Sequence, residues 1–238
     1  RCPEPSLKFG AFCAIVWVLP TWVFFQADDS PPDPDPSRFI EEIEGFEQED
    51  RTSPPEPGSI LFLGSSSIKR WKLETSFPDR HVVNRGFGGS QLSDVSYYAD
   101  RVVAPYAPSL VVVYAGDNDI AHGKSPQRVR DDFLTLAKRI HRHAPDVPVL
   151  FLSIKPSLAR SHLWPEMQEA NELIRLACEE SELLGFIDVS SPMLDAEGQM
   201  QPDLYARDGL HLSEQGYALW TKVLEPALPE KTEEDASP

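Results

Sequence analysis

The stretch ILFLGSSS at residues 60–67 is a short apolar run that ends in one glycine and three serines. Four consecutive large apolar residues, with no polar residue between them, are typical of a strand that is buried on both faces of a sheet. A glycine followed by serines favours a turn and then a helix, because serine is a common N-terminal cap. Residues 60–67 therefore predict a buried strand that passes directly into a helix.

The same alternation of strand and helix continues toward the C-terminus. Five apolar runs are predicted as strands, at 60–63, 81–84, 110–115, 149–153 and 186–189. Helical patterns separate them at 92–103, after a cap at Ser125, at 163–184 and at 213–224. This order predicts an α/β fold with three α/β/α layers around a five-stranded parallel sheet. Right-handed crossovers then favour the flavodoxin-like strand order 2-1-3-4-5.

The chain of 238 residues suits one substantial domain. Its formal net charge of −16 is concentrated toward the two ends. Residues 28–58 carry 11 acidic and 2 basic side chains, and residues 224–238 carry 5 and 1, whereas residues 59–223 carry 21 and 17. Because nucleic-acid binding requires clustered Lys and Arg, this distribution argues against a nucleic-acid partner.

Residues 1–27 contain Lys8 followed by an apolar run at 9–25. A positive charge before about 15 apolar residues is typical of a signal peptide, whereas a membrane-spanning helix needs about 20. We therefore expect residues 1–27 to be a signal peptide or an N-terminal membrane anchor. The protein is expected to be exported, and to be periplasmic, extracellular or anchored to the envelope.

Residues 28–58 are interpreted as an acidic, proline-rich linker that contains one bracing helix. The segment DDSPPDPDPS at 28–37 has nothing to bury and predicts an extended, solvated tether. Ser37 is expected to cap a helix that runs to about Arg51 and packs on the domain. One face of that helix would carry Phe39, Ile40, Ile43 and Phe46. The domain itself is predicted at 59–228, followed by an acidic tail at 229–238.

The cysteines and the remaining histidines give no signal for a metal site. Cys2 and Cys13 fall within residues 1–27, and Cys178 lies in a helical pattern where a small buried hydrophobe is expected. His141 and His143 fall in the last turn of a predicted helix, where polar side chains complement the helix dipole. Neither a disulfide nor a zinc spacing is indicated.

Polar or glycine-rich segments follow the first three predicted strands. They are GSSS at 64–67, NRGFGG at 84–89 and GDND at 116–119. Because the carboxyl ends of parallel strands share one edge of a sheet, these segments are expected to border one crevice. They would bring a serine hydroxyl, bare backbone N–H groups and the amide of Asn118 together.

These groups are the ones that acyl transfer requires. A serine attacks the ester carbonyl, and the oxyanion that forms needs hydrogen-bond donors, here the N–H groups of Ser66 and Gly89 and the side chain of Asn118. Serine also needs a base, because a neutral hydroxyl is a weak nucleophile. His211, in RDGLH at 207–211, has Asp208 three residues before it, and the pair predicts a base with its orienting carboxylate.

The four segments GSSS, NRGFGG, GDND and DGLH, in this order and spacing, resemble the SGNH (GDSL-type) hydrolases from about residue 60 to residue 224. The resemblance implies a serine esterase that forms an acyl-serine intermediate and needs no metal or organic cofactor. It implies that Ser66, Asp208 and His211 are catalytic, and that Ser66, Gly89 and Asn118 form the oxyanion hole. The Gly-x-Ser-x-Gly elbow of α/β-hydrolases is absent from the sequence.

Two positions depart from the family pattern. Ser65 stands where the Gly-Asp-Ser motif has Asp, so Ser65 and Ser67 stay open as alternatives to Ser66, which occupies the third place of the motif. Asp117 stands where the third segment commonly has a second glycine.

The expected substrate is a short-chain carboxylic ester, including acetyl esters of carbohydrates. The segment at 155–164 carries Arg160 and Trp164, which would lie beside the crevice and contact a sugar. Two alternatives stay open: an acyltransferase that uses the same residues, and a binding domain that keeps the fold without catalysis. The sequence gives no indication of the oligomeric state.

Overall fold

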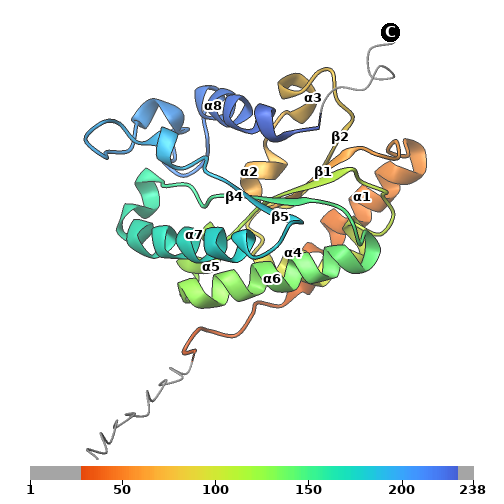
Figure 1. Cartoon of the computed structure of the whole chain (residues 1–238), viewed down its shortest axis with the longest axis horizontal. Helices are drawn as coiled ribbons and strands as arrows, with labels where there is room; N and C mark the ends of the chain where they lie inside the picture. Colours follow the sequence, from red (N-terminus) through yellow and green to blue (C-terminus); the bar gives the residue numbers. More distant parts are fainter. Residues whose placement is uncertain (1–27, 230–238) are drawn as a thin grey trace, which may run out of the picture.

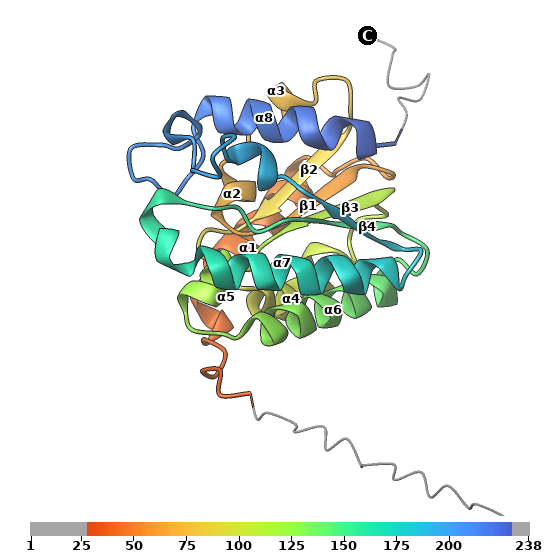
Figure 2. The same cartoon turned by 60° about the vertical axis from the view of Figure 1, so that its left-hand side comes forward.

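A computed structural model describes residues 28–229 and contains a five-stranded parallel sheet with helices on both faces (Figures 1 and 2). The strands are β1 (Ile60–Gly64), β2 (Val82–Gly86), β3 (Leu110–Tyr114), β4 (Val149–Leu152) and β5 (Leu184–Ile187). Their order is β2-β1-β3-β4-β5, which confirms the predicted fold class and strand order. The predicted signal peptide or anchor at 1–27, and residues 230–238 of the acidic tail, lie outside the described residues.

The central strand β1 explains why its sequence is apolar without interruption. Leu61 and Leu63 point into the hydrophobic cluster on one face of the sheet, and Ile60 and Phe62 point into the cluster on the other face. All four side chains are at most 4% exposed. Strand β1 therefore contributes side chains to both hydrophobic clusters, because successive side chains in a strand alternate between the two faces of the sheet.

Helices of very different length cover the two faces (Figure 2). One face carries α1 (Ile40–Thr52), α4 (Leu92–Val102), α6 (Pro126–His143) and α7 (Trp164–Glu179). The other carries the short helices α2 (Ser66–Lys69) and α3 (Leu73–Ser76) and the C-terminal α8 (Glu214–Leu224). On this second face, the buried indole of Trp220 packs 4.9 Å from the ring of Tyr114. Within residues 28–229 no helix is both long and apolar enough to cross a bilayer.

Two predicted strand positions were wrong by one or two residues. The helix predicted at 163–184 ends at Glu179, and the strand predicted at 186–189 is β5, Leu184–Ile187. Leu183 and Leu184 fit the apolar pattern of either element, and the pairing of Leu184 with Val149 on β4 decides for the strand. Strand β2 runs from Val82 to Gly86, rather than 81–84, because it pairs with β1 along its whole length.

The N-terminal helix begins differently from the prediction. Asp35, not Ser37, caps a 3-10 turn (Pro36–Phe39), and its carboxylate accepts the N–H of Ser37 at 2.9 Å. This turn leads into α1. Phe39, the last residue of the turn, packs edge-on against Phe87 of the domain, with 5.0 Å between the ring centroids. Ile40 is 37% exposed, so it does not share the buried face of Phe39 and Ile43.

The segment before that turn is not a free tether as predicted. Asp33 contacts the ammonium of Lys124 at 2.8 Å and the guanidinium of Arg128 at 2.8 Å. Ser30 accepts the backbone N–H of Ser125 at 2.8 Å. Because the side chain of Lys124 is fully buried, its charge requires carboxylate partners, and Asp33 is one of them. An acidic residue of this segment, which the sequence predicted to be solvated, therefore forms ion pairs with basic side chains of the domain.

Candidate active site

The turn between β1 and α2 places the serines at the edge of the sheet. Gly64 has φ +134°, and a Cβ at this position would lie 1.8 Å from the carbonyl oxygen of Tyr114 on β3. Only glycine fits this close approach. It lets the N–H of Ser65 donate to the same carbonyl at 2.9 Å, and α2 then starts at Ser66, with one residue between strand and helix.

Exposure and contacts distinguish the three serines. Ser65 and Ser67 are at most 1% exposed, whereas Ser66 is partly exposed. The Oγ of Ser66 lies 3.1 Å from Nε2 of His211. Ser66 is therefore the serine of the cluster that meets the histidine, and the partly exposed position gives its hydroxyl access to solvent.

Asp208 holds the other side of the His211 ring. Its Oδ2 lies 2.7 Å from Nδ1 of His211, and its Oδ1 accepts the backbone N–H groups of Leu210 and His211, both at 2.9 Å. These hydrogen bonds, led by the one from the imidazole, hold the pKa of the Asp208 carboxyl well below its ordinary value. The carboxylate thus stays ionised and fixes an Nδ1–H tautomer, which leaves Nε2 free to accept a proton from Ser66.

The loop of Asp208 and His211 is closed by its own backbone. The N–H of Ala206 donates to the carbonyl of His211 at 2.8 Å, and the N–H of Gly209 donates to the carbonyl of Ala206 at 2.9 Å. Ser213, two residues after the histidine, caps α8 by accepting the N–H of Gly216. His211 therefore projects from a short loop that backbone hydrogen bonds close and that leads into the capped start of α8.

Asn118 and Gly89 lie on the segments that follow β3 and β2. Asn118 is the second residue of α5 (Asp117–Ala121), and its Nδ2 donates to the carbonyl of Ser90 at 3.1 Å. Gly89 has φ +82° and is exposed, with no atom within 4 Å of the place where a Cβ would lie. Gly89 thus offers a backbone N–H with no side chain beside it, and Asn118 offers a carboxamide. The two segments are in contact through Asn118 and Ser90.

Backbone and side-chain hydrogen bonds tie the four sequence segments together. The N–H of Phe87 donates to Gly64, which joins the second segment to the first. Ser65 binds Tyr114, the last residue of β3, two residues before the third segment, and Asn118 of the third segment binds Ser90, the residue after the second. Ser66 with His211 joins the first segment to the fourth. The structure therefore brings together Ser66, Asn118, Asp208 and His211, with Gly89 on the loop that Asn118 binds.

A comparison with known protein families finds one whose model matches more than half of the chain. The model of the GDSL-like lipase/acylhydrolase family matches residues 63–219. The chain belongs to this family. No curated protein sequence matches the chain.

Solved structures share the fold of this chain. A protein provisionally named a platelet activating factor from Streptococcus pneumonia has a TM-score of 0.73 at 23% identity, covering 81% of this chain and 94% of that one. A GDSL-like lipase from Bacteroides thetaiotaomicron has 0.63 at 19%, covering 81% and 96%. An acetyl-xylooligosaccharide esterase from Geobacillus Stearmophilus has 0.59 at 15%, covering 73% and 96%.

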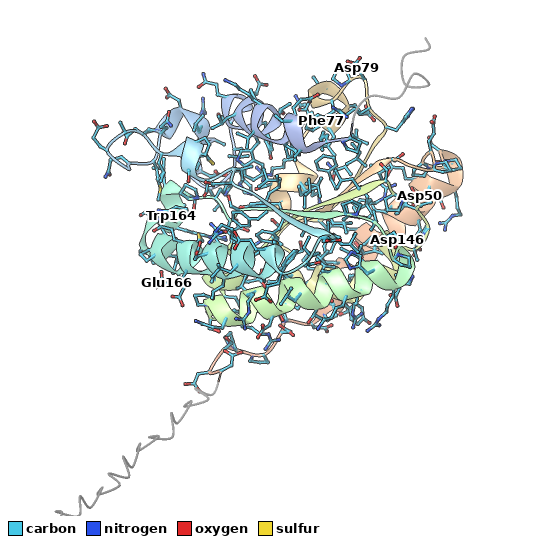
Figure 3. The ribbon with its side chains drawn as sticks, in the orientation of Figure 1. Asp50, Phe77, Asp79, Asp146, Trp164 and Glu166 are labelled. Carbon is cyan, nitrogen blue, oxygen red and sulfur yellow. The ribbon has the colours of Figure 1, made fainter. Side chains whose placement is uncertain are left out.

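Arg160 and Trp164, the two residues predicted to lie beside the active-site crevice, have different surroundings. The Nη2 of Arg160 donates to Oδ1 of Asn118 at 3.1 Å, so the guanidinium joins the group around Ser66. Trp164 begins α7 and is partly buried against the hydrophobic cluster on that face (Figure 3). Its indole therefore has a packing role, and stacking on a sugar stays a prediction.

Two charged residues lie beneath the site, and the sequence predicted no role for either of them. Asp117 and Lys155 are 4% and 1% exposed, and Oδ2 of Asp117 lies 3.9 Å from Nζ of Lys155 and 3.4 Å from Nη1 of Arg160. Burial lowers the pKa of Lys155, and the charge of Asp117 opposes that effect. The signal available in the sequence was a charged residue three positions after the end of each of two neighbouring strands, β3 and β4.

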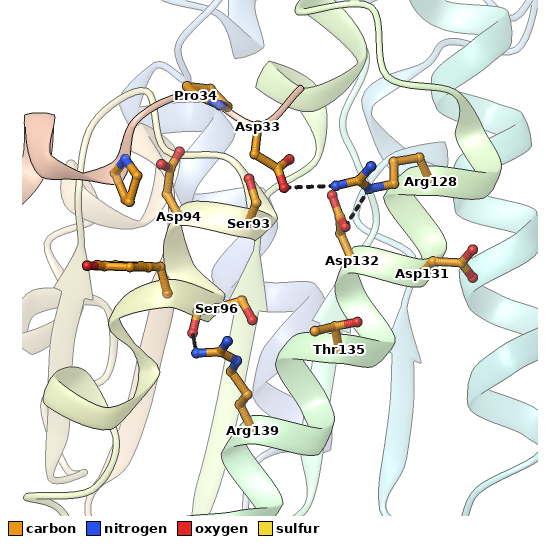
Figure 4. A pocket seen from close by; sticks show the side chains of 12 residues that line it. Asp33, Pro34, Ser93, Asp94, Ser96, Arg128, Asp131, Asp132, Thr135 and Arg139 are labelled. Carbon is orange, nitrogen blue, oxygen red and sulfur yellow. Dashed lines mark hydrogen bonds and ion pairs between the residues drawn. The ribbon is translucent and has the colours of Figure 1, made fainter. Parts of the chain in front are cut away.

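A cavity of about 510 Å³ lies away from these residues, between α4, α6 and the segment around Asp33 (Figure 4). Its wall includes the ion pairs that Arg128 makes with Asp33 and Asp132, and none of the site residues predicted from the sequence.

In the described part of the chain, no three His, Cys, Asp or Glu side chains converge as metal ligands would.

Proposed function

We propose that this GDSL-like acylhydrolase is a serine esterase that cleaves short-chain carboxylic esters through an acyl-serine intermediate. The observation that carries the proposal is the position of His211, whose Nε2 lies 3.1 Å from the Ser66 hydroxyl and whose Nδ1 lies 2.7 Å from the Asp208 carboxylate. A nucleophile, a base and a carboxylate that orients the base are thereby in hydrogen-bond contact. Membership of the acylhydrolase family supports the same reaction class.

The proposed reaction starts when Oγ of Ser66 attacks the ester carbonyl carbon and His211 takes the hydroxyl proton on Nε2. The carbonyl oxygen becomes an oxyanion, which the N–H groups of Ser66 and Gly89 and Nδ2 of Asn118 would stabilise. The C–O bond to the alcohol then breaks, and His211 returns its proton to the leaving alkoxide. Water attacks the acyl-Ser66 ester by the same steps, which releases the acid and restores the serine.

The test of catalysis uses a fluorophosphonate probe and p-nitrophenyl acetate. The wild-type protein is expected to form a covalent adduct and to hydrolyse the ester, and Ser66→Ala is expected to do neither. Ser65→Ala and Ser67→Ala are matched controls, because both serines are buried and lack the contact with His211. An unlabelled, inactive wild-type protein that is correctly folded would instead favour the non-catalytic binding domain.

We propose an acetyl group, with a carbohydrate as one candidate alcohol, as the preferred substrate. One of the structures that share the fold is an acetyl-xylooligosaccharide esterase. The partly exposed Ser66 and the exposed Gly89 leave polar groups where the alcohol part of the substrate would lie, which suits a polar alcohol. Rates are expected to fall from acetyl through butyryl to decanoyl p-nitrophenyl esters, and a steep rise with chain length would contradict the proposal.

Transfer of the acyl group to an alcohol in place of water would use the same residues. Product analysis separates the two reactions. When glycerol or a sugar is added, hydrolysis still releases the acyl group only as the free acid, and the added alcohol is not acylated. An acylated acceptor as the main product would make the protein a transferase.

A further inference from the structure

We propose that Arg160 is a positioning residue that fixes the orientation of the Asn118 amide, and that it acts on catalysis through this amide. The inference rests on the proposed function, since it concerns a group assigned to the oxyanion hole. Arg160 lies on the 3-10 segment Leu158–Leu163 after β4, and its side chain is 21% exposed. Its Nη2 reaches Oδ1 of Asn118 at 3.1 Å.

The chemistry of the guanidinium determines which end of the amide faces it. Arginine carries five N–H donors and no acceptor, so a group within hydrogen-bond distance of it must be an acceptor. The carboxamide oxygen of Asn118 therefore faces Arg160, and the NH2 group faces the opposite way. One hydrogen of that NH2 goes to the carbonyl of Ser90 at 3.1 Å, and the second stays available for the oxyanion. With the amide rotated by 180°, NH2 would face a cation and no donor would face the substrate.

Arg160 is itself held in a defined place. Its Nη1 donates to the carbonyl oxygen of Asp117 at 3.0 Å and lies 3.4 Å from the Asp117 carboxylate. Asp117 is buried and also lies near the buried ammonium of Lys155, so one carboxylate faces two cations. The planar fork of arginine can contact Asp117 and Asn118 at once, which a lysine ammonium does less well because it acts as a point charge.

The same segment also contacts the loop of the base. The N–H of Ala159, the residue before Arg160, donates to the carbonyl of Gly209 at 3.0 Å. Gly209 lies between Asp208 and His211. Residues 159 and 160 therefore connect the carboxamide of Asn118 with the loop that carries His211, and Arg160 is the member that reaches the carboxamide.

The test is a double-mutant cycle on p-nitrophenyl acetate with Arg160→Met, Asn118→Ala and the double variant. Asn118→Ala is expected to lower kcat by about 10²–10³, as loss of one oxyanion donor does. Arg160→Met is expected to lower kcat by about tenfold or more with little change in KM, because only transition-state binding suffers. If Arg160 acts through Asn118, the double variant matches Asn118→Ala within about twofold.

Two outcomes would overturn the inference. One is a cycle in which the two losses multiply, and the other is an Arg160→Met variant whose KM rises while kcat is unchanged. Either result would mean that Arg160 contacts the substrate directly or acts independently of the amide. A wild-type protein without esterase activity would instead refute the proposed function, so the two failures are distinguishable.

A matched control and a conservative variant complete the design. Arg175→Met, on the surface of α7, removes a guanidinium that pairs with Glu172 and Glu179, and kcat is expected to stay unchanged. Arg160→Lys keeps one donor for Asn118 and is expected to recover part of the kcat lost in Arg160→Met. Thermal unfolding is recorded for every variant, and if Arg160→Met unfolds early the cycle is run with Arg160→Lys.

Discussion

Asp208 accepts hydrogen bonds from one imidazole and two backbone amides, and these bonds keep its carboxylate ionised. Asp208→Asn keeps the shape of the side chain but favours the wrong histidine tautomer, so kcat is expected to fall by about 10³–10⁴. Initial rates with p-nitrophenyl acetate check this, with the exposed Asp203→Asn as a control. A loss below about tenfold would contradict the role of Asp208.

The low pKa of Asp208 also has a consequence for the pH profile. An ordinary aspartate titrates near pH 4, and Asp208 titrates below that value because its charged form is hydrogen-bonded. Loss of wild-type activity on the acid side of neutrality, at any pH above about 4, is therefore expected to come from groups other than Asp208.

Cys178 is 5% exposed on α7, and burial raises the pKa of its thiol to about 11. Because the thiolate is the reactive form, the thiol is expected to be unreactive in the folded protein near pH 8. Thiol titration with a disulfide reagent checks this in a chain whose Cys2 and Cys13 are replaced by serine. Reaction is expected only after denaturant is added, and rapid reaction of the native protein would contradict the buried position.

At the scale of elements, the turn from β1 into α2 depends on Gly64. An alanine there would place its Cβ 1.8 Å from a backbone oxygen of β3 and would keep a positive φ. Neither strain can relax without moving the sheet, so Gly64→Ala is expected to lower the free energy of unfolding by about 3 kcal/mol or more. Urea denaturation followed by circular dichroism measures this quantity.

Gly45, in the middle of α1, gives the matched control. It is exposed, and no atom lies within 4 Å of the Cβ position. Because glycine in a helix interior costs about 0.5–1 kcal/mol relative to alanine, Gly45→Ala is expected to stabilise the protein by that amount. Equal effects of the two substitutions would show that the approach of Gly64 to β3 is not a constraint.

At the scale of the whole molecule, one buried ammonium joins four parts of the fold. Nζ of Lys124 contacts Asp119 on α5, Asp132 on α6, Asp33 in the N-terminal segment and Ser93 on α4, at 2.7–3.1 Å. Burial raises the pKa of Asp119 to about 7, although Lys124 and the N–H of Leu92 oppose that shift. Protonation of Asp119 is therefore linked to folding.

The sign of this linkage follows from the direction of the shift. Asp119 binds a proton more tightly in the folded chain than in the unfolded one, so its contribution to stability is complete below about pH 4 and is lost as the pH rises through about 7. The free energy of unfolding of the wild type, measured relative to Asp119→Asn, is expected to fall by on the order of 1–3 kcal/mol from about pH 5 to about pH 8. Urea denaturation at both values checks this, with Asp131→Asn as a control on the surface of α6. A difference that does not change with pH would contradict the linkage.

The order of elements and the positions of the four segments were predictable because they depend on local pattern. A fully apolar run such as 60–63 excludes an exposed strand, and polar segments at strand ends must meet where parallel strands share an edge. The strand-end rule predicted that Ser66, Gly89 and Asn118 share one edge of the sheet, and right-handed crossovers predicted its strand order. The spacing of Asp208 and His211, together with the resemblance to the SGNH hydrolases, added these two residues. The limits of β5 were not predictable in this way, because Leu183 and Leu184 also fit a helix.

The sequence alone determined the order of strands, helices and reactive segments, because hydrophobic periodicity and turn-forming residues act over a few positions. Only the tertiary structure decided which serine meets His211, which amide Arg160 holds and where Asp33 is bound. Each of these depends on a contact between side chains 42 to 145 residues apart, and the partner of a charged or polar group is set by distance and burial in the folded chain.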